Sequence, residues 1–323
     1  MRSYRECKGA WRYRVSALAA GGFLLSILAG CGSGPGSMGV SSPDEAAIAA
    51  ALESDSFFTF HLTGTDEDQE SRAAAAAQAA VSAPSAGAIG GTAELPVFWW
   101  RGGVDCLQKD YDISVVDNTA TVTVTHFAAG GFHVARDIGR VLVLWGVPLA
   151  DTAVRHAEFV KKPWGWKLTA ISPVDISLTD DPRQSVWISR IRVYSGGELV
   201  WSTDSPSSLY SVPEGIPTFL SGEEVLVEAD IVRTDDSVWT PAEFVFLHRP
   251  AHTILGGMTR DLMFDDGTNG DAVAGDGTYS RTYTIGPHAG RHFAVVDVID
   301  AAAFMEQDAP YNSGAWGMPY IVE

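Results

Sequence analysis

Alternating apolar and polar side chains restrict the middle of this chain to β-structure. Thr119–Phe127 alternates threonine with alanine and valine, which is the period of two expected for a strand with one wet face. Tyr111–Val116 precedes it as a second predicted strand, and Val154–Lys162 and Trp166–Ile171 predict a hairpin around a Pro-Trp-Gly turn. The segment is therefore expected to form a meander of antiparallel strands.

A helix is predicted just before these strands. Ser42 is a good N-cap, Pro43 suits the first helical position, and Glu45 completes a capping box. An apolar stripe at helical spacing follows at Ile48, Ala51 and Leu52. One helix on an antiparallel meander predicts an α+β domain over residues 43–172, with an Ala-rich insertion near 64–94.

The rest of the chain predicts an all-β domain at 185–323, after a linker at 173–184. Short apolar runs there are separated by Gly, Pro and Asp turns, which favours a β-sandwich. The predicted strands are Val186–Tyr194, Leu199–Ser202, Glu224–Val232, Glu243–Leu247, Tyr279–Ile285 and His292–Ile299. The segment 310–320 is expected to be a loop that leads a last strand back into the sheet.

Two family resemblances accompany these patterns. Ala157–Lys161 followed by Trp164–Leu168 resembles the closing strands of cystatin-like or nuclear-transport-factor-like domains. That resemblance implies a helix against a curved sheet, a fold that serves as a ligand pocket in many members and as an enzyme in some. Ser221–Glu228 and Asp265–Tyr279 resemble a strand and a turn of bacterial immunoglobulin-like modules, which implies a setting at the cell surface.

The N-terminus resembles the signal of a bacterial lipoprotein. Five basic residues precede an apolar stretch from Val15, and Leu28–Cys31 reads Leu-Ala-Gly-Cys, which is similar to a lipobox. The resemblance implies cleavage after residue 30 and lipidation of Cys31, with residues 31–42 as a flexible tether. Gly32 and Ser33 follow without an aspartate, which in the enterobacterial sorting rule implies the outer membrane.

The acidic composition restricts the partners. The chain holds 22 basic and 40 acidic residues; removing residues 1–30 removes five and one, leaving 17 and 39, a net charge near −22. Such a charge argues against nucleic acid, whose phosphates need Lys and Arg, and against anionic headgroups. As a module of the cell envelope, the chain is expected to have an envelope protein or a polysaccharide as its partner, and to reach the membrane through the lipid anchor.

Only one thiol remains for other chemistry. The lipoprotein resemblance implies that Cys7 leaves with the signal and that Cys31 is lipidated, so Cys106 is left alone and no intramolecular disulfide is expected. Asp105 beside it disfavours a thiolate, and a packed or idle thiol is the preferred interpretation.

The segment 265–276 is the best candidate metal site. Its oxygen-bearing side chains, separated by glycines, are of the kind that calcium prefers: Asp265, Asp266, Asn269, Asp271 and Asp276. The spacing is not that of an EF-hand. A tight turn, in which Asp and Asn bind their own backbone, explains the same residues and is the favoured alternative.

Histidines and aromatic residues provide weaker candidates. His288 and His292 are four residues apart across a glycine, and a structural or surface role is the favoured interpretation. His61, His126 and His156, with Asp110 and Asp112, are candidates for a concave face that binds a ligand or acts as acid and base, and solvent-facing strand positions explain them equally well. Trp187, Trp201, Trp239, Tyr311 and Trp316 would stack on sugars if exposed, but are expected to be mostly core.

No nucleophile elbow, zinc helix or phosphate-binding glycine loop occurs in the sequence. The sequence therefore predicts a lipid-anchored envelope protein without enzymatic activity, acting as a binding or structural module. Two alternatives stay open: a small-ligand or enzymatic site in the first domain, and carbohydrate binding by the second.

Overall fold

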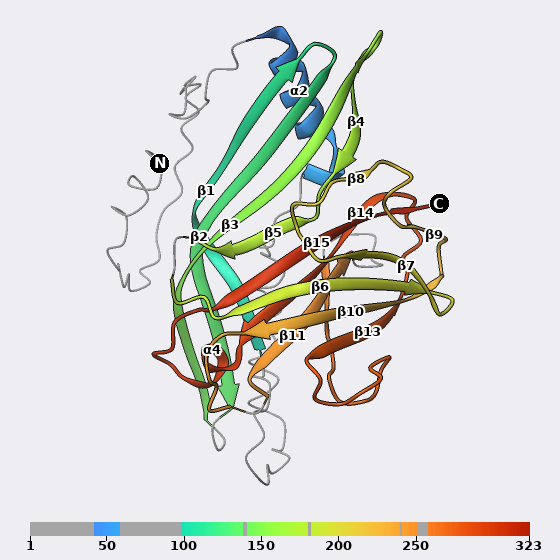
Figure 1. Cartoon of the computed structure of the whole chain (residues 1–323). Coiled ribbons are helices and arrows are strands. Elements are labelled where there is room, and N and C mark those ends of the chain that lie inside the picture. The colour runs from blue at the N-terminus through green and yellow to red at the C-terminus, as the bar shows by residue number, and fades with distance from the viewer. Residues whose placement is uncertain (1–41, 59–97, 138–140, 180–181, 240, 251–257) are drawn as a thin grey trace, which may run out of the picture. The chain divides into compact units, whose positions relative to one another are not determined.

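The computed structural model describes residues 42–58, 98–137, 141–179, 182–239, 241–250 and 258–323, without the side chains of 103–107. Ser42–Glu323 forms one compact unit, and its secondary structure is almost entirely β (Figure 1). The first elements are α2 (Pro43–Ser54), η1 (Ser56–Phe58), β1 (Phe98–Val116), β2 (Thr119–Asp137), β3 (Leu142–Lys162), β4 (Gly165–Ile171) and β5 (Val174–Leu178).

The second half of the chain adds ten strands and one short helix. They are β6 (Val186–Ser195), β7 (Glu198–Thr203), β8 (Tyr210–Ser211), β9 (Thr218–Phe219), β10 (Glu224–Arg233), β11 (Glu243–Pro250), β12 (Met258–Leu262), β13 (Thr278–Thr284), β14 (Gly290–Asp300), α4 (Ala301–Met305) and β15 (Ser313–Val322).

The described strands form two sheets. The larger has the order β1-β2-β3-β5-β15-β14-β11-β12, with β4, β8 and β9 at its side, and the smaller has the order β13-β10-β6-β7. β5 lies within the segment predicted as a linker, and pairs with β3 on one side and β15 on the other. Strands from both predicted domains are thus hydrogen-bonded in one sheet.

The larger sheet curls, so that the two ends of its strand order meet. Trp99 on β1 packs on Phe246 of β11, with ring centroids 5.0 Å apart. Arg260 on β12 donates a hydrogen bond to the backbone oxygen of Trp99 at 3.1 Å. The concave side encloses a core of aromatic and aliphatic side chains that includes Phe132, Phe304 and Tyr311.

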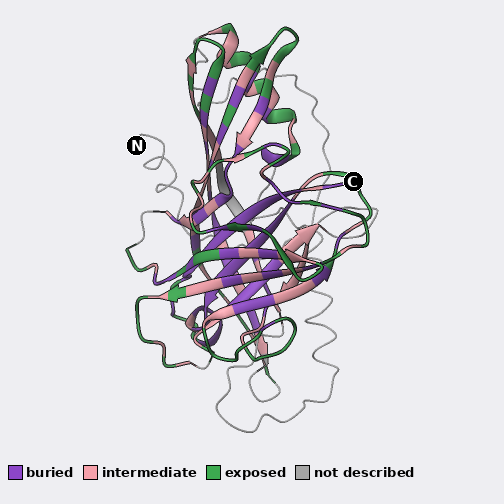
Figure 2. Cartoon of the chain, turned by 45° about the vertical axis from the view of Figure 1, so that its right-hand side comes forward, coloured by how far each residue is buried: buried purple, intermediate pink, exposed green. Residues whose placement is uncertain are grey.

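Two further large cores lie elsewhere, beside a small cluster of Val174, Ile176, Val295 and Ala315. Side chains of β6, β10 and β13 pack against those of β11, β14 and β15, forming the layer between the sheets. β14 and β15 lie on that layer and are buried along most of their length (Figure 2). The third core lies under α2, where Ile48 and Leu52 meet Val122, Val124 and Phe159.

The predicted start of the helix is confirmed. Ser42 accepts a hydrogen bond from the backbone of Glu45, Glu45 accepts one from the backbone of Ser42, and Pro43 occupies the first turn. The predicted Ala-rich insertion at 64–94 and the tether at 31–42, apart from its last residue, lie outside the described residues.

The predicted α+β fold of residues 43–172 is wrong. The structure is nearly all β, with a curled antiparallel sheet and a second sheet. β1 and β2 each have 19 residues and β3 has 21, a length of roughly 60 Å at about 3.3 Å per residue. A helix of 12 residues spans only about 18 Å. α2 therefore covers one end of these strands, and other strands cover the rest.

The predicted loop at 310–320 is also wrong, because β15 occupies most of it. β15 pairs with β14 and β5 in the middle of the larger sheet. Its Gly314, Gly317 and Pro319 lower the β propensity of the segment. Burial on both faces overrides that propensity: Ala315 is 3% and Met318 0% exposed.

Candidate functional site

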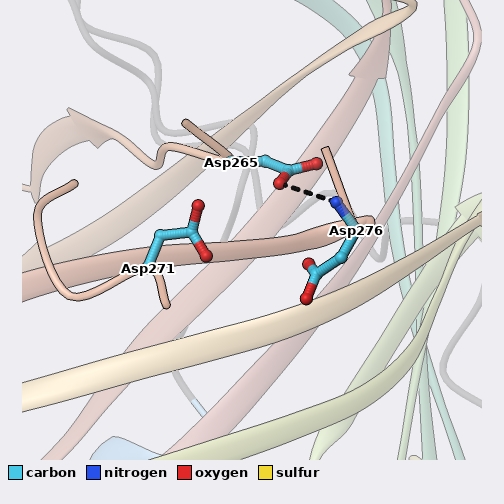
Figure 3. A group of neighbouring side chains, drawn as sticks. All are labelled: Asp265, Asp271 and Asp276. Atoms are coloured by element: carbon cyan, nitrogen blue, oxygen red, sulfur yellow. Dashed lines mark hydrogen bonds between the residues drawn. The ribbon is translucent and has the colours of Figure 1, made fainter. Parts of the chain in front are cut away.

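Three aspartates of the predicted metal site meet in the turn between β12 and β13. One carboxylate oxygen each from Asp265, Asp271 and Asp276 lies within 4.8 Å of the other two, and Figure 3 shows the three side chains around a common point. Calcium binds oxygens at about 2.3–2.6 Å, so two ligands on opposite sides of an ion lie about 5 Å apart. The spacing is compatible with one shared cation.

The same carboxylates hold the turn together through the backbone. Asp265 accepts hydrogen bonds from the backbone of Gly275, Asp276 and Gly277 at 2.6 to 3.1 Å, one of which is drawn in Figure 3. Asp271 accepts from Gly267 and Val273. Gly275 and Gly277 have φ of 77° and 83°, values that favour glycine. These contacts are those expected of the turn interpretation.

The other two predicted ligands lie apart from the trio. Asp266 accepts hydrogen bonds from the backbone and hydroxyl of Thr268, and the Asn269 amide donates to the Thr268 hydroxyl. Both Asp266 and Asn269 are exposed. Three of the five predicted ligands therefore converge.

A buried charged cluster, which sequence reasoning missed, lies on the concave side of the larger sheet. Arg101 on β1 donates two hydrogen bonds to the carboxylate of Asp297 on β14, at 2.7 and 2.9 Å. His248 on β11 lies 3.0 Å from the same carboxylate. The Asp297 side chain is 0% exposed and that of His248 is 12% exposed.

Tyr311 extends this cluster to β3. Its hydroxyl accepts hydrogen bonds from Arg101 at 2.7 Å and from Ser313 at 2.5 Å, and donates to Asp151 at 3.4 Å. The second carboxyl oxygen of Asp151 is buried without a hydrogen-bond partner. The buried cluster is thus Arg101, Asp151, His248, Asp297, Tyr311 and Ser313.

The charges of the buried cluster depend on one another. Burial by itself would raise the pKa of Asp297, but Arg101 and His248 outweigh it and lower that pKa well below its usual range. Burial lowers the pKa of His248 despite Asp297, so His248 is neutral at pH 7. Because an ionised carboxylate only accepts, Nε2 of His248 carries the proton that it donates to Asp297.

The pKa of Asp151 is shifted in the opposite direction from that of Asp297. Burial raises the pKa of Asp151 to about 7, with the charge of Asp297 adding to this and that of Arg101 opposing it. A carboxyl with this pKa exchanges its proton near neutrality. A His–Asp pair and such a carboxyl can act as acid and base, but every group except His248 is less than a tenth exposed.

No local sequence signal marks the buried cluster. Its contacts join residues 196, 210 and 160 positions apart, brought together by the curl of the sheet. From the sequence, Tyr311 was predicted only as one of the aromatic residues of the second half.

The histidines predicted for the first domain do not converge. His126 follows Val122 and Val124 at even positions on β2, on the face that packs under α2. His156 lies beside Thr123, with 3.2 Å between Nδ1 and the hydroxyl, on the opposite face. Asp112 is in register with Thr123, whereas Asp110 binds Gln108. His61 lies outside the described residues.

The remaining candidates are placed as follows. His292 Nε2 lies 2.7 Å from the carbonyl oxygen of His288. Trp201, Tyr311 and Trp316 are buried and Trp239 is half-buried, which leaves Trp187 as the exposed ring of that predicted set, at 37%.

Cys106 lies within β1, and Cys31 lies outside the described residues. Among the described residues no helix has the length and apolarity needed to span a membrane.

Comparison with known proteins yields two partial similarities. The chain is 28% identical over 166 residues to undecaprenyl-diphosphatase 1 of Frankia alni, covering 50% of this chain and 55% of that protein. It is 29% identical over 99 residues to undecaprenyl-diphosphatase 1 of Streptomyces avermitilis, covering 29% and 35%. The chain thus spans about half or less of each relative. No family model and no solved structure matches.

Proposed function

We propose that the protein is a lipid-anchored component of the bacterial cell envelope that acts as a binding or structural module without catalysing a reaction. The observation that carries this proposal is Leu28–Cys31 at the end of an apolar run with a basic start. A single acyl chain holds a protein only marginally, and two or more give stable anchoring. Following the sorting rule for Gly32 and Ser33, the outer membrane is its proposed site.

The arrangement of the charged groups supports a structural role for the buried cluster. The carboxylate of Asp297 accepts hydrogen bonds from Arg101 and His248. The Tyr311 hydroxyl is hydrogen-bonded to Arg101, Asp151 and Ser313. Because Arg101 and Asp297 satisfy each other's charge and hydrogen bonds, we assign the buried cluster the structural role of holding β1 against β14. A partner would then bind at the surface of the protein and not at the buried cluster.

The anchor is tested by cell fractionation in a bacterial host that processes lipoproteins. Wild-type protein is expected in the membrane fraction, and Cys31→Ser in the soluble exported fraction. Cys106→Ser is the matched control, because it removes a thiol from the same chain outside the lipobox; it should stay with the membrane. Membrane retention of Cys31→Ser equal to wild type would contradict lipid anchoring at that residue.

The names of the two partial relatives favour one competing function, hydrolysis of a diphosphate. Among the described residues, His248 and the buried cluster behind it hold a His–Asp pair and a carboxyl that can act as acid and base. Release of phosphate from undecaprenyl diphosphate by the purified chain, lost in His248→Ala and retained in His288→Ala, would support the enzyme and contradict the module. No release by the wild-type chain supports the module.

Sugar binding by the second half is less well supported by the surface. A flat row of exposed rings would favour it, and of the five aromatic residues predicted for it only Trp187 is in the exposed class.

A further inference from the structure

Two β-turns lie side by side at the end of the larger sheet that α2 covers (Figure 1). The turn between β1 and β2 adjoins the turn between β3 and β4, because the Lys161 backbone donates a hydrogen bond to the Asn118 carbonyl oxygen at 2.8 Å. Each turn exposes a large apolar side chain: Trp164 is 81% exposed and Val116 63%. Trp187, the other exposed aromatic ring among the described residues, reaches only 37%. The two turns are therefore a candidate contact for a partner.

The exposed side chains of the two turns occupy one face of the sheet. A row of register partners runs across β1, β2, β3 and β4: Val116, Thr119, Val160 and Lys167. Partners in register point to the same face, and Lys162 shares it with Val160 because side chains two apart in a strand point the same way. α2 packs on the opposite face of these strands. The row and Lys162 therefore lie on a face that α2 leaves open.

Lysine is concentrated at the two turns. The chain has five lysines, and three of them are Lys161, Lys162 and Lys167. The acidic side chains around them are Asp44, Asp117 and Glu158. Lys161 pairs with Asp44 at 2.7 Å, and Glu158 lies four residues back from Lys162 along β3, roughly 13 Å at about 3.3 Å per residue. The outermost charges are thus two lysines and one aspartate, so this end is not acidic, although the chain carries a net charge of −18.

The segment that carries the predicted lipid anchor joins the folded unit at this same end. Asp44, in the first turn of α2, pairs with Lys161 and accepts a hydrogen bond from Nε1 of Trp166 at 3.2 Å. Cys31 precedes Ser42 by 11 residues, which span at most about 40 Å. A lipidated Cys31 therefore keeps the start of α2 within that reach of the bilayer, with the two turns beside it.

We propose that the two turns enter the interface of the lipid bilayer, as a second membrane contact beside the lipid anchor. The side chains that make this contact are Val116, Lys162, Trp164 and Lys167. Tryptophan favours the headgroup level, where its ring is in apolar surroundings and its N–H finds acceptors. Lysine lays its stem along apolar surface and donates from its ammonium group to lipid phosphates. The orientation rests on the proposed anchor at Cys31. A sugar would stack on Trp164 but leave the exposed Val116 without a contact, which favours the bilayer.

Quenching of tryptophan fluorescence by lipids brominated in their acyl chains tests this contact. The full chain, made in a lipoprotein-processing bacterium, is reconstituted in phosphatidylcholine vesicles with and without bromine. Bromine is expected to quench part of the wild-type fluorescence, and that part should be lost in Trp164→Phe. Trp187→Phe removes the exposed ring of β6 and should be quenched as the wild type is.

Two valine variants test the apolar contact without changing a tryptophan. Val116→Asp places a charge at the first turn and is expected to lose the quenching of Trp164, because a carboxylate disfavours entry into the bilayer. Val238→Asp makes the same change at a valine that is 87% exposed, between β10 and β11, and should keep the quenching. Equal quenching in the two variants would overturn the role of the turns.

Flotation of the chain with the vesicles reports on the anchor separately from the turns. Flotation without quenching that depends on Trp164 would overturn the proposal and leave the anchor in place. Quenching that depends on Trp164 in a chain that takes up no labelled palmitate would support the contact and contradict the anchor, whereas a chain that neither floats nor is quenched would contradict both. A change in Trp164 emission with soluble polygalacturonate, and none with brominated vesicles, would overturn the bilayer in favour of a polysaccharide.

Discussion

At the scale of single residues, the Arg101–Asp297 pair is a fully buried ion pair that joins two strands far apart in the larger sheet. Breaking a buried pair leaves one charge uncompensated, at a cost of about 3–5 kcal/mol. Both side chains are at most 4% exposed, so water cannot replace the lost partner. The pair joins β1 to β14, strands separated by four others in the order of the sheet.

Arg101→Met is therefore expected to lower the free energy of unfolding by about 3–5 kcal/mol, measured by urea denaturation at pH 7. Lys161→Met is the matched control, because Lys161 also pairs with an aspartate, Asp44, but at the surface with side chains 43% and 36% exposed. Its loss should be below about 1 kcal/mol. Equal losses for the two variants would contradict the importance of the buried pair.

Asp151 makes the free energy of unfolding depend on pH, in the direction opposite to that of an ordinary paired aspartate. Its pKa is about 7 in the folded protein and 3.8 in a free side chain, so between these values the folded state holds more of the proton. Stability from this group falls as the pH rises from about 4 to 7, by at most about 1.4 kcal/mol per pH unit. Asp151→Asn removes the dependence.

Urea denaturation of wild type and Asp151→Asn at several pH values checks this. The stability of the variant minus that of the wild type should increase as the pH rises through that window and level off above pH 7. Asp297→Asn should show no such increase, since the pKa of Asp297 is lowered. A difference independent of pH for Asp151→Asn would mean that Asp151 is already ionised across the window.

At the scale of elements, structure fixed by contacts between near neighbours in the chain could be predicted from the sequence, whereas contacts between distant segments could not. Ser42, Pro43 and Glu45 define the helix start by contacts within one turn, and six predicted strands of the second half lie within β6, β7, β10, β11, β13 and β14, give or take an end residue. The trio of aspartates was also readable, because its members lie within twelve residues. The buried cluster was not, since its members meet only when the sheet curls.

The N-cap of α2 provides one test at this scale. Ser42→Ala removes the acceptor for the Glu45 backbone and should destabilise the helix by about 1 kcal/mol, seen as faster hydrogen exchange of α2 amides. Ser54→Ala, at the other end of the same helix with a hydroxyl bound to Ala51, should change exchange less. Equal acceleration by both would contradict a capping role for Ser42.

The turn at 265–276, between β12 and β13, provides a second test. Asp271 is 8% exposed and accepts from two backbone donors, so Asp271→Ala should lose about 1–3 kcal/mol even in the presence of a chelator. Asp266→Ala, exposed and bound only to Thr268, should lose less. Loss of stability equal to or below that of Asp266→Ala would contradict the role of Asp271 in the turn.

Calcium binding by the same turn stays a prediction, and titration calorimetry decides it. Heat that saturates, together with a higher melting temperature in calcium than in chelator, both absent in Asp276→Ala, would establish an ion held by Asp265, Asp271 and Asp276. Absence of heat would leave hydrogen-bonded turn chemistry as the whole explanation of these residues.

At the scale of the whole molecule, the shared sheet links the two halves of the chain. β5 and β15 connect strands of the first half to those of the second through continuous hydrogen bonds. The linker predicted at 173–184 hid this connection, because Val174–Leu178 is only five residues long and is enclosed by Pro, Asp and Ser. Short strands of this kind are recognised by their neighbours in space rather than by their own pattern.

The shared sheet predicts one thermal unfolding transition for the folded unit. Far-ultraviolet circular dichroism, which follows β-structure, and tryptophan fluorescence should give the same midpoint. Two separate midpoints would support the two-domain division predicted from the sequence. Arg101→Met should lower the single midpoint without dividing it.

The central claim is that the chain is tethered to the membrane through Cys31. The most direct measurement is incorporation of labelled palmitate into the full chain expressed in a lipoprotein-processing bacterium, compared with Cys31→Ser and with Cys7→Ser, a substitution within the predicted signal. Label in the wild type and in Cys7→Ser, and none in Cys31→Ser, is the predicted result. Label that persists in Cys31→Ser, or an unlabelled wild-type chain, would contradict the claim.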